Sequence, residues 1–99
     1  MSLPDLRLNP EASVEFGEAF AWYFERSHQI AEEFDREIDR ALHHIRMSPQ
    51  RWPLFRGRYR RIMVRRFPFY LVYEINDSSI MVLAVAHGRR KPGYWQGRN

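Results

Sequence analysis

The sequence predicts an α+β fold in the order strand-helix-helix-strand-strand-strand, with an antiparallel two-helix hairpin packed on one face of a mostly antiparallel four-stranded sheet. Two observations predict it. Residues 10–48 carry apolar side chains at helical spacing, whereas residues 59–87 carry alternating and continuous apolar runs separated by turn residues. With 99 residues, 44% of them hydrophobic, the chain has the length and composition of one domain with its own core.

The first half begins with a short predicted strand, Leu6 to Leu8, followed by a helix. Asn9 is a favourable N-cap, Pro10 suits the first helical position, and Glu11 lies at the positive end of the helix dipole. Apolar residues at helical spacing continue this helix to about Arg26: Ala12, Phe16, Ala19, Phe20 and Tyr23.

A second helix is predicted after Ser27, its expected cap, and ends before Pro49, because the residue preceding a proline is pushed out of the helical region. With so few residues between them, the two helices should form an antiparallel hairpin. One side of the second helix is charged, and the other carries a continuous apolar stripe: Ile30, Phe34, Ile38, Ala41, Leu42 and Ile45.

The second half predicts a loop over residues 49–57, which should tuck Trp52 and Phe55 onto the core, and then three strands. The last strand is apolar throughout, as expected of a central strand covered on both faces. The strands are bounded by turn residues and are predicted over 59–66, 69–75 and 80–87.

The net charge of +4 conceals a strong asymmetry. Residues 1–50 hold five arginines and ten acidic residues, whereas residues 51–99 hold ten arginines, Lys91 and only two acidic residues. Arginine grips phosphate and carboxylate groups with a planar fork, so an arginine-rich half favours an anionic partner, either nucleic acid or an acidic protein segment. The alternative is a solvated basic face with no ligand.

The same half predicts a candidate surface on the open face of the sheet, the face turned away from the helices. Its arginines and aromatic rings suit RNA or a single strand, because guanidinium groups hold phosphates while rings stack bases. A metal-free ribonuclease is also conceivable, with His87 and Tyr94 transferring protons and arginines stabilising charge. A basic rim with a structural histidine is the alternative. The candidate residues are Arg61, Arg65, Tyr70, His87, Arg89, Arg90, Lys91 and Tyr94.

Other features point to no cofactor or metal. The adjacent His43 and His44 point in different directions, and no other ligand has metal spacing. The chain has no cysteine, signal peptide or membrane-length apolar run, so we expect it in the cytoplasm. We expect one domain over residues 1–99, with residues 1–3 a cloning remnant and residues 88–99 a basic C-terminal tail.

Several motifs occur in an informative order. Asn9-Pro10-Glu11-Ala12 comes first, Arg65-Arg66-Phe67-Pro68-Phe69 follows, and His87-Gly88-Arg89-Arg90-Lys91-Pro92-Gly93-Tyr94-Trp95 comes last. In this combination the chain resembles, over nearly its whole length, the RelE/ParE superfamily of toxins, often called plasmid stabilisation proteins. The resemblance implies the toxin of a bacterial type II toxin–antitoxin system, neutralised by an acidic, co-encoded antitoxin that wraps it. We expect aromatic residues of the first helix to receive this antitoxin: Phe20, Trp22 and Phe24.

The resemblance leaves the target open. RelE-like members cleave messenger RNA on the ribosome without metal, using a basic set with a tyrosine, whereas ParE-like members lack that set and poison DNA gyrase. Arg90 matches the arginine that the nucleases carry after the last strand, and Tyr94 lies near their tyrosine. Tyr70, however, stands where they have an essential arginine. A third alternative is a family member that has lost toxicity and serves as a non-catalytic protein-binding module.

Overall fold

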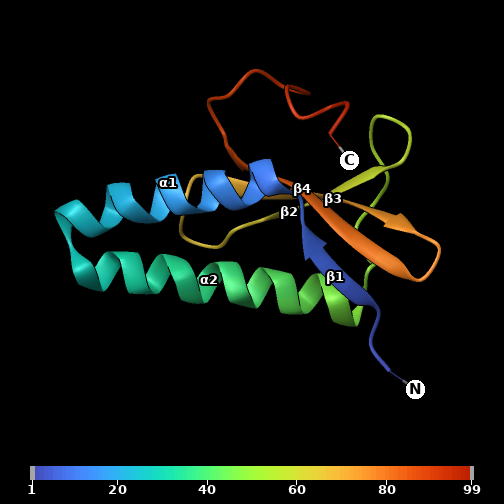
Figure 1. Cartoon of the computed structure of the whole chain (residues 1–99), viewed down its shortest axis with the longest axis horizontal. Coiled ribbons are helices and arrows are strands. Elements are labelled where there is room, and N and C mark those ends of the chain that lie inside the picture. Colours follow the sequence, from blue (N-terminus) through green and yellow to red (C-terminus); the bar gives the residue numbers. More distant parts are fainter. Residues whose placement is uncertain (1, 99) are drawn as a thin grey trace.

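The computed structural model describes residues 2–98, so Met1 and Asn99, the two ends of the predicted domain, lie outside the described residues. The strand order is β1-β4-β3-β2, with β1 parallel to β4 and the other neighbours antiparallel. The two helices lie side by side as an antiparallel hairpin (Figure 1). The predicted fold is therefore confirmed, with these elements: β1 (Asp5–Leu8), α1 (Pro10–Arg26), α2 (His28–Met47), β2 (Tyr59–Met63), β3 (Phe69–Asn76) and β4 (Ser79–His87).

Local capping sets the helix ends as predicted. The side chain of Asn9 accepts a hydrogen bond of 2.7 Å from the Glu11 amide at the start of α1. Ser27 serves both helices: its N–H donates to the Tyr23 carbonyl (2.8 Å), and its hydroxyl accepts from the Ile30 amide (3.2 Å). Because one residue ends α1 and starts α2, the chain reverses without a longer loop.

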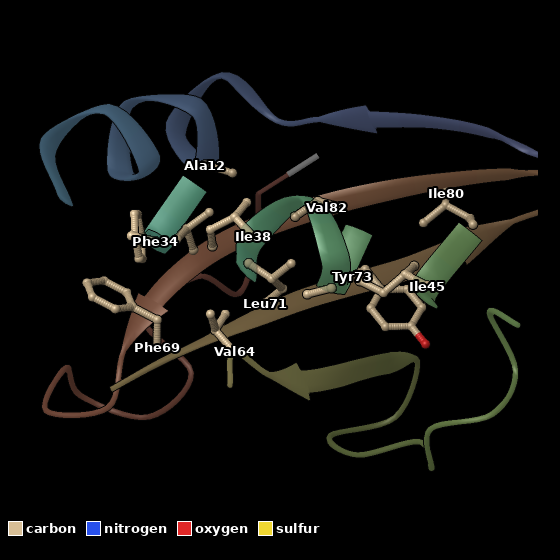
Figure 2. Close-up of a cluster of buried hydrophobic side chains, with 12 residues drawn as sticks. Ala12, Phe34, Ile38, Ile45, Val64, Phe69, Leu71, Tyr73, Ile80 and Val82 are labelled. Atoms are coloured by element: carbon tan, nitrogen blue, oxygen red, sulfur yellow. The ribbon is translucent and has the colours of Figure 1, made fainter. Parts of the chain in front are cut away.

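The main core lies between α2 and the sheet, where the side chains of α2 face those of β3 and β4 (Figure 2). Each large apolar side chain buried there stabilises the fold by about 1.5–3 kcal/mol. Helix α1 buries only Ala12 completely, and its aromatic residues are left partly exposed. The buried side chains are Phe34, Ile38, Ala41 and Ile45 on α2, and Leu71, Tyr73, Ile80 and Val82 on the sheet.

The loop before β2 is fixed to this core by Tyr73. The Tyr73 hydroxyl donates a hydrogen bond of 2.6 Å to the Pro49 carbonyl, and burial raises the pKa of Tyr73 to about 12. Trp52 packs on the core between α2 and the sheet, and Phe55 packs on the far face. Both rings are only partly buried, but the prediction that they pack onto the core is confirmed.

A β-bulge near the middle of β4 changes which side chains face the helices. The register shifts between Val72 and Tyr73 of β3, which pair with Ala84 and Val82, so that Leu83 is the extra residue. After an extra residue the side-chain alternation of a strand is reversed. Side chains on the helix face therefore fall at even positions before the bulge and odd positions after it: Ile80, Val82, Val85 and His87.

Strand β2 is shorter than predicted. It ends at Met63 instead of continuing to residue 66. Arg66 has a positive φ of 73°, and the Val64 amide donates to the Phe69 carbonyl across the turn (2.9 Å). The chain therefore leaves the strand direction at Val64 and turns Arg65 toward α2.

The sheet face away from the helices is not open, which corrects the prediction, because the C-terminal segment (residues 88–98) lies over it (Figure 1). Trp95 is 1% exposed, with its ring centroid 4.7 Å from that of Tyr59 and 5.6 Å from that of Phe55. Gly93 permits the fold-back, since its φ is +80° and a Cβ there would lie 2.8 Å from the Gln96 side chain.

Candidate functional site

The predicted candidate residues do not share one surface. The Arg61 guanidinium lies 5.6 Å from the Tyr70 ring centroid on the sheet face away from the helices. Arg65 instead reaches α2, where its Nη2 lies 3.2 Å from Glu37 Oε2. His87 faces the helix side of the sheet. The prediction of a single surface is therefore wrong, because the turn after β2 and the bulge in β4 redirect Arg65 and His87.

Glu15, on α1, organises the C-terminal segment and was missed in the sequence. Its Oε2 accepts a hydrogen bond of 2.6 Å from the Tyr94 hydroxyl, and its Oε1 accepts one of 3.0 Å from the Val85 amide. Arg98 donates to both carboxylate oxygens, at 2.9 and 3.2 Å. Only 13% of the Glu15 side chain and 11% of the Arg98 side chain are exposed. Glu15 therefore ties the C-terminal segment to α1 and to the edge of β4.

The helical spacing of Glu15 is a signal that could have revealed this role. It lies three residues after Ala12 and four before Ala19, so it falls on the apolar side of α1 and not among the solvated acidic residues. The sequence gives no comparable hint of its partner, because Arg98 lies 83 residues further on.

Tyr94 is held in its protonated form by this cluster. Burial raises the pKa of the Tyr94 hydroxyl, and its hydrogen bond to Glu15 raises it further, while Arg90 and Arg98 offset only part of the increase. Burial alone would lower the pKa of Arg98, but its bonds to Glu15 reverse the effect and raise it. The Arg90 guanidinium lies over the Tyr94 ring, 3.9 Å from its centroid, and 4.0 Å from Glu15 Oε2.

His87 makes its contacts outside the cluster around Glu15. Its Nδ1 accepts a hydrogen bond of 3.0 Å from the Arg89 amide, and its ring packs edge-on against Phe69 at 5.0 Å. Within residues 2–98, no hydrogen bond or ring contact joins His87 to Tyr94. The two residues predicted to transfer protons are therefore not joined as an acid–base pair.

A cavity of about 520 Å³ lies between α1 and the C-terminal half of β4, and we call it the α1–β4 groove. Polar and charged side chains contribute to a lining that is otherwise mostly apolar. Trp22, at 54% exposure, is the most exposed large aromatic residue that borders it. The lining residues are Glu15, Glu18, Ala19, Trp22, Tyr23, Pro68, Phe69, Val85, His87 and Arg90.

The three aromatic residues expected to bind the antitoxin also lie in different surroundings. Phe20 is half-buried against the main core, and its ring stacks with Phe24 at 5.9 Å. Phe24 is 43% exposed and stacks on His28 at 3.9 Å. Trp22, two positions from each of them, points to a different side of the helix. Of the three, Trp22 alone lines the α1–β4 groove.

The basic end of β4 lies beside this groove. Arg89, Arg90 and Lys91 follow His87, and among the described residues only Arg90 of these three lies within 4.0 Å of an acidic group. Arg89 and Lys91 are exposed and remain able to receive an anionic partner. Over the same described range, no group of three or more potential ligands is placed to hold a metal ion.

Known proteins resemble the chain over most of its length. Residues 6–92 match the family described as the ParE toxin of the type II toxin–antitoxin system, parDE. Two curated relatives, both called Toxin ParE2 and from two strains of Mycobacterium tuberculosis, are 33% identical over 89 residues, which is 88% of this chain and 84% of theirs.

A solved structure agrees with the fold. The chromosomal ParDE TA system from P. aeruginosa superposes with a TM-score of 0.67 at 14% identity, covering 85% of this chain and 95% of the matched chain. No helix within residues 2–98 is both long and apolar enough to cross a membrane. From the family match and the ParE2 relatives, the chain belongs to the ParE family of toxins of type II toxin–antitoxin systems.

Proposed function

We propose that this ParE-family toxin arrests growth in the cytoplasm by binding DNA gyrase, as ParE-like members do, and that it catalyses no RNA cleavage. The observation that carries the proposal is the 2.6 Å hydrogen bond in which the Tyr94 hydroxyl donates to Glu15. A hydroxyl whose proton is held by a buried carboxylate, and whose pKa is raised, is a poor acid or base at neutral pH.

Two further observations support a non-catalytic toxin. Metal-free RNA cleavage needs a base, an acid and cations that converge on one phosphate. Tyr70 stands where the RelE-like nucleases carry an arginine, and its ring is instead covered by Arg61. His87 packs on Phe69 without a link to Tyr94. Among residues 2–98, Tyr70 and His87 therefore add neither a cation nor a second proton-transfer group beside Tyr94.

We also propose that an antitoxin neutralises the chain. The matched family is named for a toxin–antitoxin system, and the P. aeruginosa structure is named as the ParDE system. The excess of positive charge in residues 51–99 favours an acidic partner segment. The exposed Arg89 and Lys91 offer cations to such a segment.

Induced expression in a bacterial host separates the possible targets. We expect growth arrest with an SOS response, intact transcripts and continued translation at early times. His87→Ala and Tyr94→Phe should remain toxic, provided that thermal melts show both variants to be folded. Cut transcripts together with loss of toxicity in both variants would establish the nuclease instead. Growth without arrest would indicate a protein-binding module that has lost toxicity.

A further inference from the structure

The charged side chains are separated in space as well as along the sequence. Every acidic residue of residues 1–50 except Asp5 lies on α1 or α2, the helices that cover one face of the sheet. Residues 51–99 add only Glu74, which is 5% exposed, and Asp77, in the turn after β3. Among the described residues, the cations on the sheet face away from the helices therefore have few carboxylates near them.

The cations of residues 51–99 form two groups. Those of the first group are bonded within the chain, to carboxylates or, for one of them, to backbone carbonyls. Those of the second group are exposed, and no acidic group of residues 2–98 lies within 4.0 Å of them. The first group is Arg58, Arg60, Arg65, Arg66, Arg90 and Arg98, and the second is Arg51, Arg56, Arg61, Arg89 and Lys91.

Arg61 is held in place by aromatic rings on the face away from the helices. Its guanidinium lies 5.0 Å from the ring centroid of Phe55 and 5.6 Å from that of Tyr70. Phe55 in turn packs against Trp95 of the C-terminal segment. Contact with two rings limits the orientations of the guanidinium while its charge stays exposed, so Arg61 is prepared to bind an anion.

Arg56 joins the same face from the loop before β2. A Cβ atom on Gly93 would lie 3.2 Å from Arg56 Nη1, so this guanidinium lies against the C-terminal segment, two residues beyond Lys91. We call Arg56, Arg61 and Lys91 the basic far face, because all three are exposed cations at the sheet face away from the helices.

The turn that carries Arg56 gives no structural reason for an arginine. Its ends are joined by the hydrogen bond from the Phe55 amide to the Tyr59 carbonyl at 2.8 Å. Within it, Arg56 has a φ of 49° and Gly57 a φ of 91°. Glycine, asparagine and aspartate adopt a positive φ more readily than arginine does. A long cationic side chain at this position therefore indicates a role for its charge.

A phosphate backbone fits this face better than an acidic protein does. The rings of Tyr59 and Trp95 on the same face are 7% and 1% exposed, so they are not available as apolar anchors. Protein docking depends on such anchors, whereas phosphate binding depends on charge and on arginine forks. Duplex DNA carries a negative charge about every 1.7 Å of its axis, which gives each cation of the face a phosphate to bind.

We propose that the basic far face binds the phosphate backbone of duplex DNA and holds the toxin against the DNA segment on which gyrase acts. The source of the DNA rests on the gyrase target proposed above, whereas the binding itself needs no gyrase. Arg56, Arg61 and Lys91 each bind one phosphate. Because phosphate contacts carry no base information, the binding is independent of the DNA sequence. The acidic residues on α1 and α2 disfavour the reverse orientation.

The salt dependence of binding by the wild-type toxin tests the number of phosphate contacts. The probe is a fluorescent duplex of about 20 base pairs, about 68 Å long. It exceeds the 40 Å longest extent of the toxin, and anisotropy reports its binding. With three phosphate contacts, the slope of log K against log salt should be about −2.7. The Kd should therefore rise by about 40-fold between about 50 and about 200 mM salt.

A matched pair of double variants locates the contact. Arg56→Gln with Arg61→Gln removes two of the three cations, so it should weaken binding at about 50 mM salt by about 10-fold or more and reduce the salt slope to about −0.9. The control, Arg36→Gln with Arg40→Gln, removes the same charge from exposed positions on α2 and should change binding by less than about 3-fold. Thermal melts establish that both double variants are folded.

The outcomes separate this inference from the proposed function. No binding of the duplex by the wild type at about 50 mM salt, or equal weakening by the two double variants, overturns the basic far face as a DNA-binding surface. Binding of a polyglutamate peptide as tightly as the duplex also overturns it, because the face would then bind acidic protein. Binding of the toxin to gyrase without DNA is measured separately. Its absence removes the gyrase target, whereas its presence leaves that target standing even when the duplex is not bound.

Discussion

Glu15→Gln perturbs the residue on which the C-terminal segment depends most. The substitution keeps the size and shape of the side chain but removes its negative charge. The buried Arg98 guanidinium then faces a neutral amide, and one of the two carboxylate oxygens becomes an NH2 group that cannot accept from Tyr94 or Arg98. The free energy of unfolding should fall because Arg98, a charged and mostly buried group, loses its buried counterion and keeps only the exposed Glu11, whose Oε2 lies 3.2 Å from its Nε.

The magnitude can be worked from the contacts. Hydrogen bonds to a charged group contribute about 1.5–3 kcal/mol each. Four such bonds, two from Arg98, one from Tyr94 and one from the Val85 amide, share one carboxylate, so their contributions are not additive. Removing one partner of a buried pair costs about 3–5 kcal/mol, and Glu15 and Arg98 keep 13% and 11% exposure. We expect a loss of about 3 kcal/mol, which for a domain of this size lowers Tm by about 15 °C.

Urea unfolding followed by tryptophan fluorescence measures this loss, because Trp95 lies in the segment that Glu15 holds. Glu18→Gln is the matched control: Glu18 is exposed, one turn further along α1, and should change stability by less than about 0.5 kcal/mol. Arg98→Ala should be as destabilising as Glu15→Gln, and the double variant should be little worse than either. A loss below about 1 kcal/mol for Glu15→Gln, or full additivity with Arg98→Ala, would mean that the Glu15–Arg98 pair does not hold the C-terminal segment.

Other parts of the fold give sharper local tests. Trp95→Ala should cost about 3–5 kcal/mol in urea unfolding, because its ring is 1% exposed; a cost below about 1 kcal/mol would mean that it does not cover the sheet. Burial raises the pKa of Tyr73 from 10.0 to about 12, so the unfolded chain releases this proton first and stability should fall as pH rises from about 10 to about 12. Tyr73→Phe should remove about 2 kcal/mol of that fall, and an unchanged pH profile would contradict the cause. Arg65→Ala should cost about 1 kcal/mol by leaving buried Glu37 without its 3.2 Å partner, whereas the exposed control Arg36→Ala should cost less than about 0.5 kcal/mol; equal costs would remove the role of this ion pair.

The element order and the main core could be predicted because they depend on local signals. Asn9, Ser27 and Pro49 mark the helix ends, and the stripe from Phe34 to Ile45 has the period of a helix with one buried side. Such signals act within a few residues, so one sequence contains them in full.

The candidate site could not be predicted to the same degree, because it depends on two departures from regular strand geometry. The bulge at Leu83 reverses the side-chain alternation of β4 and turns His87 toward the helices. The positive φ of Arg66 ends β2 early and turns Arg65 toward Glu37. A count of alternating residues along the sequence includes neither the bulge nor the early end of β2. A shift of one residue moves every later side chain to the other face of the sheet.

The partner of Arg98 could not be predicted either, because Arg98 and Glu15 lie far apart in the sequence. The charge asymmetry predicted that the basic C-terminal half binds an anionic partner. Arg98 does bind a carboxylate, but that carboxylate belongs to Glu15 of the same chain. The distribution of charge along a sequence does not distinguish an internal partner from an external one.

A reconstituted reaction decides whether this toxin acts by binding gyrase, as we propose, or by cleaving RNA. Purified toxin is mixed with DNA gyrase and supercoiled plasmid, and separately with translating ribosomes and a defined messenger RNA. We expect linear DNA from trapped gyrase cleavage complexes with wild type and with His87→Ala, and an intact messenger RNA. A cut messenger RNA that depends on His87 and Tyr94, with no trapped gyrase, would contradict it.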